Sequence, residues 1–466
     1  MRIRVLGQYL QGSLAILALA ELAVLSFSML AATLLRFRTS LPEIEVLVGP
    51  LWSRILLYSV VMIACLFAFG LYSARQRAPA FGIAVRMGAA VCAGTAVTAV
   101  CFYILPNVWL GRGVMAFTAI ISFLALVVSR YIFTHIVDDA VFKRRVLVYG
   151  CGQRAASIAK LRRRTDRRGF VVVGYAQPDG EELSVPAEHL LSSREKLQEI
   201  CRQNDVDEVV VAMDDRRRAF PILDLLECRL AGIDVTELLT FLERETGRVR
   251  IDVLNPSWMI FGEGFRRDPI RLFSSRALDI VASLVILLIS SPVMILTAVA
   301  IKLEDGLRAP VFYRQGRVGL GGHVFNVLKF RSMRTDAERD GKAQWAKVGD
   351  SRVTRVGAVI RKIRVDELPQ ILNVLRGQMS FVGPRPERPQ FVHELSEKIP
   401  YYVQRHCVKP GITGWAQLCY PYGSSEQDAL EKLQYDLYYI KNNTLIFDLA
   451  ILMQTAEVVF MGHGAR

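Results

Sequence analysis

Long apolar segments constrain the fold of this chain more than any other feature. Hydrophobic residues make up 52% of its 466 positions. Four apolar segments near the N-terminus occupy residues 13–35, 55–74, 87–111 and 113–137. A helix needs roughly 20 apolar residues to cross a hydrocarbon core of about 30 Å, so each segment is long enough to span a membrane. Glu21 interrupts the first segment and Arg130 the last. The sequence predicts that residues 1–140 form a four-helix transmembrane bundle.

Basic residues in the connections predict the orientation of this bundle. Arg75, Arg77 and Arg86 fill the second connection and residues 143–145 after the fourth segment are all basic, whereas the third connection offers only Arg112. In membrane proteins the cytoplasmic loops carry the excess of Lys and Arg. Both ends of the bundle are therefore expected in the cytoplasm.

Charge and cysteine content narrow the class of partner only partly. The net charge of +14 fits nucleic acid, anionic lipid or a phosphorylated substrate, and charge alone does not choose among them. The eight cysteines are scattered, with no CxxC pair and no histidine at zinc spacing. They are typical of reduced thiols and do not predict a disulfide framework or a zinc site.

An α/β pattern follows the bundle and predicts a Rossmann-like cytoplasmic domain over residues 141–262. Its expected strands are residues 145–149, 170–175 and 208–213, with a helix at 220–231. Gly150-Cys-Gly-Gln-Arg-Ala155 is the glycine-rich turn of dinucleotide-binding domains. However, the second strand ends in Tyr175-Ala-Gln, without the acid that would hold a ribose, and Asp179 comes late. A nucleotide-sensing or purely structural domain is therefore favoured over dinucleotide catalysis.

A fifth apolar segment, residues 280–301, has 22 positions without a charge. Ser290-Ser291-Pro292 lies just past its middle. Proline removes one helical hydrogen bond and clashes with a preceding carbonyl, and serine hydroxyls can satisfy the freed groups. Two structures remain open at this point: a bent helix that enters and leaves the membrane on one face, and a kinked transmembrane helix.

Two adjacent carboxylates, Asp366 and Glu367, mark the candidate centre of chemistry. They precede a predicted helix, because apolar residues recur at helical spacing from Leu368, Pro369 suits a first turn and Gly377 suits a stop. The positive end of the helix dipole would favour the ionised forms of both groups. A plain N-terminal cap is the simpler explanation of such a pair.

The sequence around the pair is strongly basic, which indicates an anionic substrate. Fifteen Lys or Arg stand against eight Asp or Glu over residues 302–370, although a solvated face or a lipid-headgroup patch would also fit. Candidate phosphate ligands are Lys329 after a predicted strand (residues 323–328), Arg361 just before the pair, and Arg385 between Pro384 and Pro386. Arginine and lysine are the usual phosphate-binding side chains, and two flanking prolines would hold Arg385 rigid. Residues 409–414 are a turn-rich loop that either closes over a ligand or forms a plain turn.

Four ordered motifs together resemble the bacterial polyprenyl-phosphate sugar-1-phosphate transferases, also called monotopic phosphoglycosyl transferases. They are Lys329-Phe-Arg-Ser-Met333, Val365-Asp-Glu-Leu-Pro-Gln370, Gly383-Pro-Arg-Pro386 and Lys409-Pro-Gly-Ile-Thr-Gly-Trp-Ala-Gln417. The match runs from about Arg276 to the C-terminus, and the preceding bundle and α/β domain resemble the long form of the family. The resemblance implies a re-entrant helix at about 276–303, kinked at Ser291 and Pro292, within an α/β catalytic domain at 263–466. Both soluble parts would face the cytoplasm at the bacterial inner membrane.

The resemblance also implies a reaction and its partners. Asp366 would attack the β-phosphorus of a UDP-sugar, and undecaprenyl phosphate would then take the sugar phosphate as a first step of exopolysaccharide or O-antigen synthesis. Glu367 would hold Mg²⁺, and Lys329, Arg361 and Arg385 would bind phosphate oxygens. Glucose or galactose is the expected sugar, with N-acetylated sugars next. The lipid bilayer is a partner, nucleic acid is not, and a homodimer is the candidate assembly.

Two features limit or extend this comparison. Residues 418–423 read Leu-Cys-Tyr-Pro-Tyr-Gly where many members carry Asn-Gly-Arg, and this form resembles a branch tied to exopolysaccharide systems. The apolar tail at 444–461 is interrupted by Asp448 and Glu457, so it is expected to lie on the membrane or pack on the core. The competing functions are a membrane-anchored oxidoreductase built on the Gly150 turn and a non-catalytic, nucleotide-sensing membrane scaffold.

Overall fold

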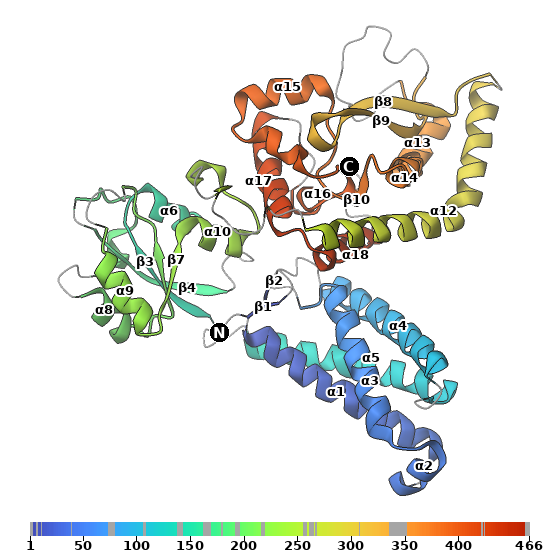
Figure 1. The fold of residues 1–466 in the computed structure, drawn as a ribbon, viewed down its shortest axis with the longest axis horizontal. Coiled ribbons are helices and arrows are strands. Elements are labelled where there is room, and N and C mark those ends of the chain that lie inside the picture. Colours follow the sequence, from blue (N-terminus) through green and yellow to red (C-terminus); the bar gives the residue numbers. More distant parts are fainter. Residues whose placement is uncertain are drawn as a thin grey trace. The chain divides into compact units, whose positions relative to one another are not determined.

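The computed structural model describes most of the chain. The described residues are 3–5, 8–10, 12–38, 40–72, 80–105, 109–137, 143–161, 169–178, 180–191, 196–215, 220–254, 259–260, 265, 268–306, 308–334, 352–420, 423 and 425–461. They fall into two compact units, Met1–Leu254 and Asn255–Arg466. The first unit holds a group of long helices and an α/β domain, and the second holds the bent helix α12 and the elements that follow it (Figure 1).

Four long helices of the first unit share one apolar core. They are α1 (Gly12–Phe37), α3 (Leu51–Ala68), α4 (Ala80–Ile104) and α5 (Arg112–Val137). Leu25, Met62 and Ala90 are fully buried in this core, while the opposite faces leave large apolar side chains exposed. Each helix is long and apolar enough to cross a membrane. Before and between them lie the short strands β1 (Ile3–Val5) and β2 (Gln8–Leu10) and the helix α2 (Leu41–Val48).

The third predicted helix was misplaced by seven residues, because α4 begins at Ala80 and ends at Ile104 rather than covering 87–111. Its end has a local cause: Pro106 disfavours helical backbone in the preceding residue, Leu105. Arg86, assigned from sequence to the second connection, lies inside α4 and is buried. Arg75 and Arg77, also assigned to that connection, lie outside the described residues.

The two charges that interrupt the apolar segments pair with each other. Arg130 Nε donates to Glu21 Oε1 at 2.7 Å and Arg130 Nη2 donates to Oε2 at 3.1 Å. Arg130 Nη1 donates to the Leu71 carbonyl at 2.7 Å, and the Tyr72 hydroxyl donates to the Glu21 carboxylate. A buried charge is tolerated when it is paired and hydrogen-bonded, so the two interruptions act as one tie between α1 and α5.

The α/β domain has a parallel sheet, as predicted, and this sheet has five strands. Its strand order is β5-β4-β3-β6-β7. The strands are β3 (Arg144–Tyr149), β4 (Phe170–Ala176), β5 (Leu190–Leu191), β6 (Glu208–Val211) and β7 (Asp234–Glu237). The helices are α6 (Gln153–Ala159), α8 (Leu197–Gln203), α9 (Ile222–Leu230) and α10 (Leu238–Thr246). The expected strands at 145–149, 170–175 and 208–213 and the helix at 220–231 are confirmed. β5 and β7 were not predicted, because strands of two and four residues are too short to stand out in the sequence.

Helix α12 (Pro269–Asp305) opens the second unit and contains Pro292. Figure 1 shows it bent into two arms. The missing N–H of Pro292 would have bonded the Leu288 carbonyl, and the Ser291 hydroxyl donates to that carbonyl at 3.0 Å instead. Most apolar side chains between the two ends of α12 are exposed, including Leu288, Ile289 and Leu296.

Polar contacts tie both arms of α12 to the rest of the second unit. On the first arm, Arg276 donates to the carbonyls of Val374 and Leu375 at 2.6 Å each. Asp279 on the same arm accepts from Ser380 Oγ and from the Phe381 N–H. At the far end of the second arm, Glu304 accepts from the N–H groups of Arg355 and Val356 at 2.8 and 2.9 Å, and Arg331 pairs with Asp305 at 2.6 Å.

The remainder of the unit combines an antiparallel hairpin, a short parallel pair and small helices. The strands are β8 (Phe312–Val318), β9 (Val324–Phe330), β10 (Ser380–Val382) and β11 (Gly411–Thr413). The helices are α13 (Arg355–Lys362), α14 (Gln370–Leu375), α15 (Pro389–Lys398), α16 (Trp415–Cys419), α17 (Glu426–Asn442) and α18 (Leu445–Met461), with 3₁₀ turns η6 (Val365–Glu367) and η7 (Tyr402–Cys407). The strand expected at 323–328 is confirmed as β9.

Neither alternative expected for residues 409–414 is correct. Residues 411–413 form β11, which pairs with β10 in parallel. A Cβ on Gly383 would lie 2.4 Å from the Lys409 carbonyl oxygen, and one on Gly411 would lie 2.1 Å from the Gly383 nitrogen. The glycines therefore serve a close approach of two backbones and do not mark a hinged loop.

The C-terminal tail packs on this core, which is one of its two predicted placements. Phe447 and Ile451 of α18 are buried, and Asp448, only 2% exposed, accepts a hydrogen bond from the Tyr439 hydroxyl at 2.8 Å. Pro421 and Tyr422 of the unusual 418–423 segment lie outside the described residues.

Candidate active site

Asp366 and Glu367 lie in the single 3₁₀ turn η6, between α13 and α14. Arg364, just before this turn, has φ +57°. This left-handed backbone conformation is easy for glycine, which has no Cβ, and rare for other residues. The following helix begins at Gln370, with Pro369 as its N-cap, and not at residue 368 as predicted. The carboxylates therefore precede the helix by most of a turn. Strained backbone of this kind is common where a protein holds reactive side chains in place.

Glu367 is held between two cations. Lys329 Nζ donates to Glu367 Oε1 at 2.8 Å, and Arg385 Nη2 donates to the same oxygen at 3.4 Å. Burial alone would raise the pKa of Glu367, but Arg385 and Lys329 outweigh it and lower the pKa to about 2. Glu367 is thus a fixed, permanently ionised carboxylate at neutral pH.

Asp366, the residue just before Glu367, has the opposite electrostatic environment. It is half-buried and forms no ion pair with any other described residue. Burial and the neighbouring Glu367 raise the pKa of Asp366, while Lys329 and Arg361 act against that rise. The expectation that the helix dipole would favour the ionised form is therefore wrong for Asp366. A carboxylate with a raised pKa and no bound cation keeps its lone pairs for another partner.

The backbone around Arg385 is anchored at three successive carbonyls. The Pro384 carbonyl accepts from the Gly411 N–H at 2.9 Å, the Arg385 carbonyl from Arg405 Nη2 at 3.1 Å, and the Pro386 carbonyl from Arg317 Nη1 at 3.1 Å. Two prolines already restrict this segment. Arg385 is therefore presented from a rigid backbone, with its side chain 38% exposed.

The anchoring arginines were missed in the sequence. Arg405 is buried, pairs with Asp436 of α17 at 2.9 Å, and also donates to the Tyr402 hydroxyl at 2.5 Å. Arg317 on β8 also donates to Gln315 Oε1. The one available signal was Asp436, the single charged residue in the mostly apolar and aromatic stretch 433–440. Sequence does not show that such an acid meets an arginine 31 positions earlier.

Arg361 approaches the site from α13. This helix is capped twice, by the Glu304 carboxylate from α12 and by the Thr354 hydroxyl, which accepts from the Gly357 N–H at 2.9 Å. Arg361 is half-exposed, and its charge acts against the rise in the pKa of Asp366, so it lies near that carboxylate. The predicted site residues Lys329, Arg361, Asp366, Glu367 and Arg385 thus come together at one centre. Ser291 and Pro292 lie away from it, in the bend of α12.

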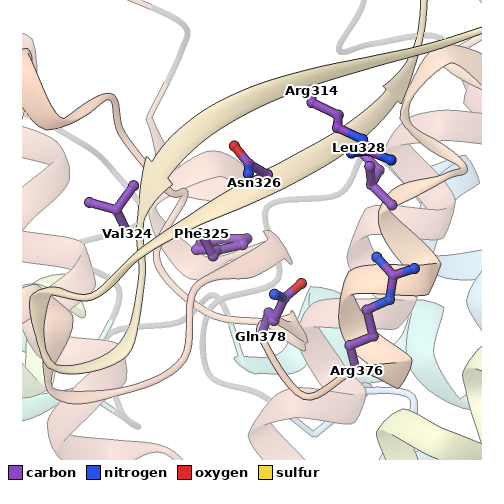
Figure 2. A pocket seen from close by; sticks show the side chains of 7 residues that line it. All are labelled: Arg314, Val324, Phe325, Asn326, Leu328, Arg376 and Gln378. Atoms are coloured by element: carbon purple, nitrogen blue, oxygen red, sulfur yellow. The ribbon is translucent and has the colours of Figure 1, made fainter.

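A pocket of about 340 Å³ lies on the other face of the β8–β9 hairpin (Figure 2). In the hairpin register Lys329 is opposite Tyr313, whereas Leu328 is opposite Arg314, so the two pairs point to opposite faces. The pocket is lined by Arg314, Leu328, Arg376, Gln378 and three neighbours on β9. Neither Asp366 nor Glu367 lines it, so it is separate from the carboxylate centre.

The fit of the centre to Mg²⁺ depends on Glu367. Both cations contact Oε1, and no hydrogen bond reaches Oε2 from the residues that the structure describes. Within those residues no group of three His, Cys, Asp or Glu side chains could hold a metal. Mg²⁺ commonly binds through one or two carboxylates and completes its shell with water and substrate phosphates. The centre therefore fits a metal that arrives with a phosphorylated ligand and does not fit an all-protein cage.

Comparisons with known proteins cover both parts of the chain. Residues 270–462 match a family described as bacterial sugar transferase, and residues 67–232 match one described as a CoA-binding domain. An Aeromonas hydrophila UDP-N-acetylgalactosamine-undecaprenyl-phosphate N-acetylgalactosaminephosphotransferase is 46% identical over 242 residues, which are 52% of this chain and 56% of that protein.

Two further relatives align over more of their length. A UDP-glucose:undecaprenyl-phosphate glucose-1-phosphate transferase of Xanthomonas campestris pv. campestris is 30% identical over 470 aligned positions, 97% of this chain and 95% of that protein. An undecaprenyl-phosphate glucose phosphotransferase of Komagataeibacter xylinus is 32% identical over 372 positions, 77% of this chain and 67% of that protein.

Proposed function

The chain belongs to the bacterial sugar transferases that act on polyprenyl phosphate, and from this premise we propose that it moves a sugar 1-phosphate from a UDP-sugar to undecaprenyl phosphate through a covalent intermediate on Asp366. The resemblance inferred from its motifs is confirmed at the level of the family, and the protein is a phosphoglycosyl transferase of the membrane. Its nucleophile, metal, sugar and orientation belong to the proposal.

One observation carries the assignment of the nucleophile: two adjacent carboxylates have opposite environments. Glu367 is tied to Lys329 and Arg385 and its pKa is about 2, whereas Asp366 forms no ion pair with a described residue and its pKa is raised. A more basic, uncommitted carboxylate is the better nucleophile, and a fixed one is the better anchor.

In the first half-reaction, an Asp366 carboxylate oxygen attacks the β-phosphorus of the UDP-sugar. A new bond joins that oxygen to phosphorus, the bond from the β-phosphorus to the bridging oxygen breaks, and UMP leaves with the electron pair. The product is an acyl phosphate that carries the sugar. No proton has to move, because Asp366 reacts as its anion and the UMP phosphate is a stable leaving group.

In the second half-reaction, a phosphate oxygen of undecaprenyl phosphate attacks the same phosphorus. The phosphorus–aspartyl oxygen bond breaks, and Asp366 returns to its free carboxylate. The lipid then carries the sugar through a diphosphate. Each displacement inverts the phosphorus, so the account predicts overall retention at that atom.

Cations make this approach of like charges feasible. An anionic carboxylate and a diphosphate repel each other unless positive charge lies between them. Lys329 and Arg385 hold the Glu367 carboxylate, and Lys329 and Arg361 lie close enough to Asp366 to act against the rise in its pKa. Positive charge therefore surrounds the pair. Mg²⁺, held by Glu367, would neutralise the diphosphate and stabilise the departing UMP.

The placement of α12 supports a re-entrant topology at the bacterial inner membrane. Arg276 and Asp279 on the first arm and Glu304 at the end of the second arm all contact the same folded unit. A straight span would carry one of these ends to the far side of the bilayer. With both arms on one face, both soluble parts lie in the cytoplasm, as the basic connections of the helical region also favour.

The identity of the sugar stays open within a short list. The relatives include proteins named as transferases of N-acetylgalactosamine, glucose and galactose. The expectation of glucose or galactose is therefore retained together with N-acetylgalactosamine.

A UMP-release assay tests this function. Membranes that contain the full chain are supplied with undecaprenyl phosphate, Mg²⁺ and, in turn, UDP-glucose, UDP-galactose, UDP-N-acetylglucosamine and UDP-N-acetylgalactosamine. We expect release with at least one donor, and a loss on the order of 10⁴-fold in Asp366→Asn, as for removal of a covalent nucleophile. Glu397→Gln, an exposed carboxylate on α15, is the matched control and keeps full activity. Normal turnover by Asp366→Asn would disprove the nucleophile, and absence of release with every donor would contradict the function.

A further inference from the structure

The glycine turn of the α/β domain has an unexpected occupant. In dinucleotide-binding domains the turn after the first strand leaves room for a pyrophosphate at the start of the next helix, and coenzyme A presents the same phosphate chemistry. The match of residues 67–232 to a CoA-binding family would suggest such a ligand here. We infer instead that this turn holds no phosphate-bearing cofactor, because the carboxylates of Asp214 and Glu181 fill the phosphate position and close the turn.

Asp214 takes the backbone donors that a phosphate would use. It follows β6, the strand beside β3, and its Oδ2 accepts from the Gln153 N–H at 2.8 Å. Its Oδ1 accepts from the Arg154 N–H, also at 2.8 Å. These are the first amides of α6, so the positive end of that helix is already bound to an anionic group from the same domain.

Glu181 completes the closure from the segment after β4. Its Oε2 accepts from the Cys151 N–H at 2.8 Å, and its Oε1 accepts from the Asp214 N–H at 2.7 Å. The Glu181 carboxylate therefore binds the turn and also holds Asp214, the residue that caps α6. Three backbone donors of the turn, at 151, 153 and 154, are satisfied by two side chains.

The space normally left by the glycines is also filled. A Cβ on Gly152 would lie 2.1 Å from Asp214 Oδ2, so the carboxylate occupies the place where a pyrophosphate would approach. A Cβ on Gly150 would lie 2.6 Å from the Ala212 carbonyl oxygen, and Gly150 has φ +133°. Packing within the domain thus accounts for both glycines without a ligand.

The electrostatics of the turn oppose a second anion. Two carboxylates lie at the turn, and after burial, the larger cause, they raise the pKa of the Cys151 thiol to about 11. Arg154, the cation of the turn itself, has Nη1 3.5 Å from the Met213 carbonyl. At the ribose position, Gln177 donates to the Glu181 carbonyl at 3.2 Å. Phosphate would have to displace two carboxylates that already bind the donors of the turn.

A closed turn gives the domain a structural role in place of a sensing role. The two carboxylates join the ends of β3 and β6 to the segment after β4. The transferase would then work without coenzyme A, nicotinamide or adenine nucleotides.

A domain-specific readout is available to test this closure. Cys201 and Cys228 are buried in the α/β domain at 1% and 0% exposure, so their reaction with a maleimide, followed by peptide mass spectrometry, measures opening of this domain within the full chain. The chain is compared in lipid nanodiscs as wild type, Asp214→Ala, Asp214→Asn and the control Glu227→Ala, an exposed carboxylate on α9. Burial and, to a smaller extent, the adjacent Glu227 raise the pKa of the Cys228 thiol, so only Cys201 is read in this control. Asp214→Asn keeps one acceptor oxygen and serves if the alanine variant fails to fold.

We expect labelling of both thiols to accelerate about 5- to 30-fold in Asp214→Ala, as for loss of a helix cap, and less in Asp214→Asn. Inorganic phosphate should slow labelling in Asp214→Ala, because it can replace the missing carboxylate, and should leave wild type and Glu227→Ala unchanged. Coenzyme A, NAD⁺ and ATP, titrated calorimetrically against wild type in the presence of excess UMP to cover the catalytic centre, should give no binding heat. Saturable binding of any of the three, or equal protection of wild type and Asp214→Ala by phosphate, would overturn the inference.

Discussion

At the scale of single residues, two neighbours in the chain acquire different chemistry from their surroundings. Asp366 and Glu367 share a 3₁₀ turn, yet only Glu367 meets Lys329 and Arg385. The difference arises because Lys329 of β9 and Arg385 of the Gly383–Pro386 segment contact Glu367, whereas no ion pair reaches Asp366 from the residues that the structure describes. Sequence placed the correct residue types together. It could not show which carboxylate the cations would take, because that depends on side-chain direction in a turn.

The pH dependence of UMP release tests this division of roles. Asp366 must be ionised to attack, and because its pKa is raised, the rate should fall as pH drops through a value above the ordinary range for aspartate. Arg361 lowers that pKa, so Arg361→Gln should move the acid limb to higher pH. The maximal rate of UMP release by Arg361→Gln, reached above the acid limb, should also fall about 10- to 100-fold, as for a lost charged contact of about 1.5–3 kcal/mol.

The measurement is a single-turnover burst of UMP without lipid acceptor, so that titration of the acceptor's phosphate monoester does not contribute to the profile. Lys362→Gln, the exposed neighbour on the same helix, should leave both limb and plateau in place. A lower plateau with an unmoved acid limb would mean that Arg361 binds substrate without tuning Asp366.

At the scale of elements, α12 connects the membrane to the chemistry. Its first arm holds the C-terminal end of α14 and the start of β10, and its second arm caps α13, which carries Arg361. The elements on either side of the Asp366 turn are therefore both attached to one membrane helix. Under the proposed topology, the two arms end on one side of the bilayer.

Cysteine labelling tests that topology. Glu227→Cys on α9 lies before α12 in the chain and Glu397→Cys on α15 lies after it, and both positions are exposed. In a background that carries Cys407→Ser, both should react with a membrane-impermeant maleimide in inverted vesicles, and neither should react in intact spheroplasts. Opposite accessibility of the two positions would show that α12 crosses the membrane.

The elements also show how far sequence reasoning reaches. Buried strands such as β3, β4 and β6 were found because their apolar runs are continuous, and α12 was found with its bend because proline acts locally. β10 and β11 have three residues each and were missed, since their pairing rests on the contact between Gly383 and Gly411. The Arg405–Asp436 pair behind Arg385 was missed for the same reason: its partners meet only in the folded chain.

At the scale of the whole molecule, the proposed catalytic residues all lie in one of the two compact units. Lys329, Arg361, Asp366, Glu367 and Arg385 all belong to the second unit, Asn255–Arg466. An uncharacterized sugar transferase of Bacillus subtilis, EpsL, aligns over 41% of this chain and 89% of its own length at 40% identity. A protein of little more than the catalytic region therefore exists among the relatives.

A fragment that begins at Gly264 should accordingly retain measurable UMP release, below that of the full chain because it lacks the four long helices. The fragment is assayed in membranes beside its own Asp366→Asn variant, which should be inactive. A fragment that is monodisperse after extraction yet inert would show that the first unit contributes directly to the reaction.

The covalent intermediate is the central claim, and mass spectrometry after a single turnover tests it most directly. The full chain is mixed with its preferred UDP-sugar and Mg²⁺ in the absence of undecaprenyl phosphate, quenched in acid and digested. The account predicts UMP release close to one equivalent per chain, with a gain of one sugar phosphate on the peptide that contains Asp366, removed by hydroxylamine as an acyl phosphate should be. UMP release that requires the lipid acceptor, with no adduct on Asp366, would contradict it.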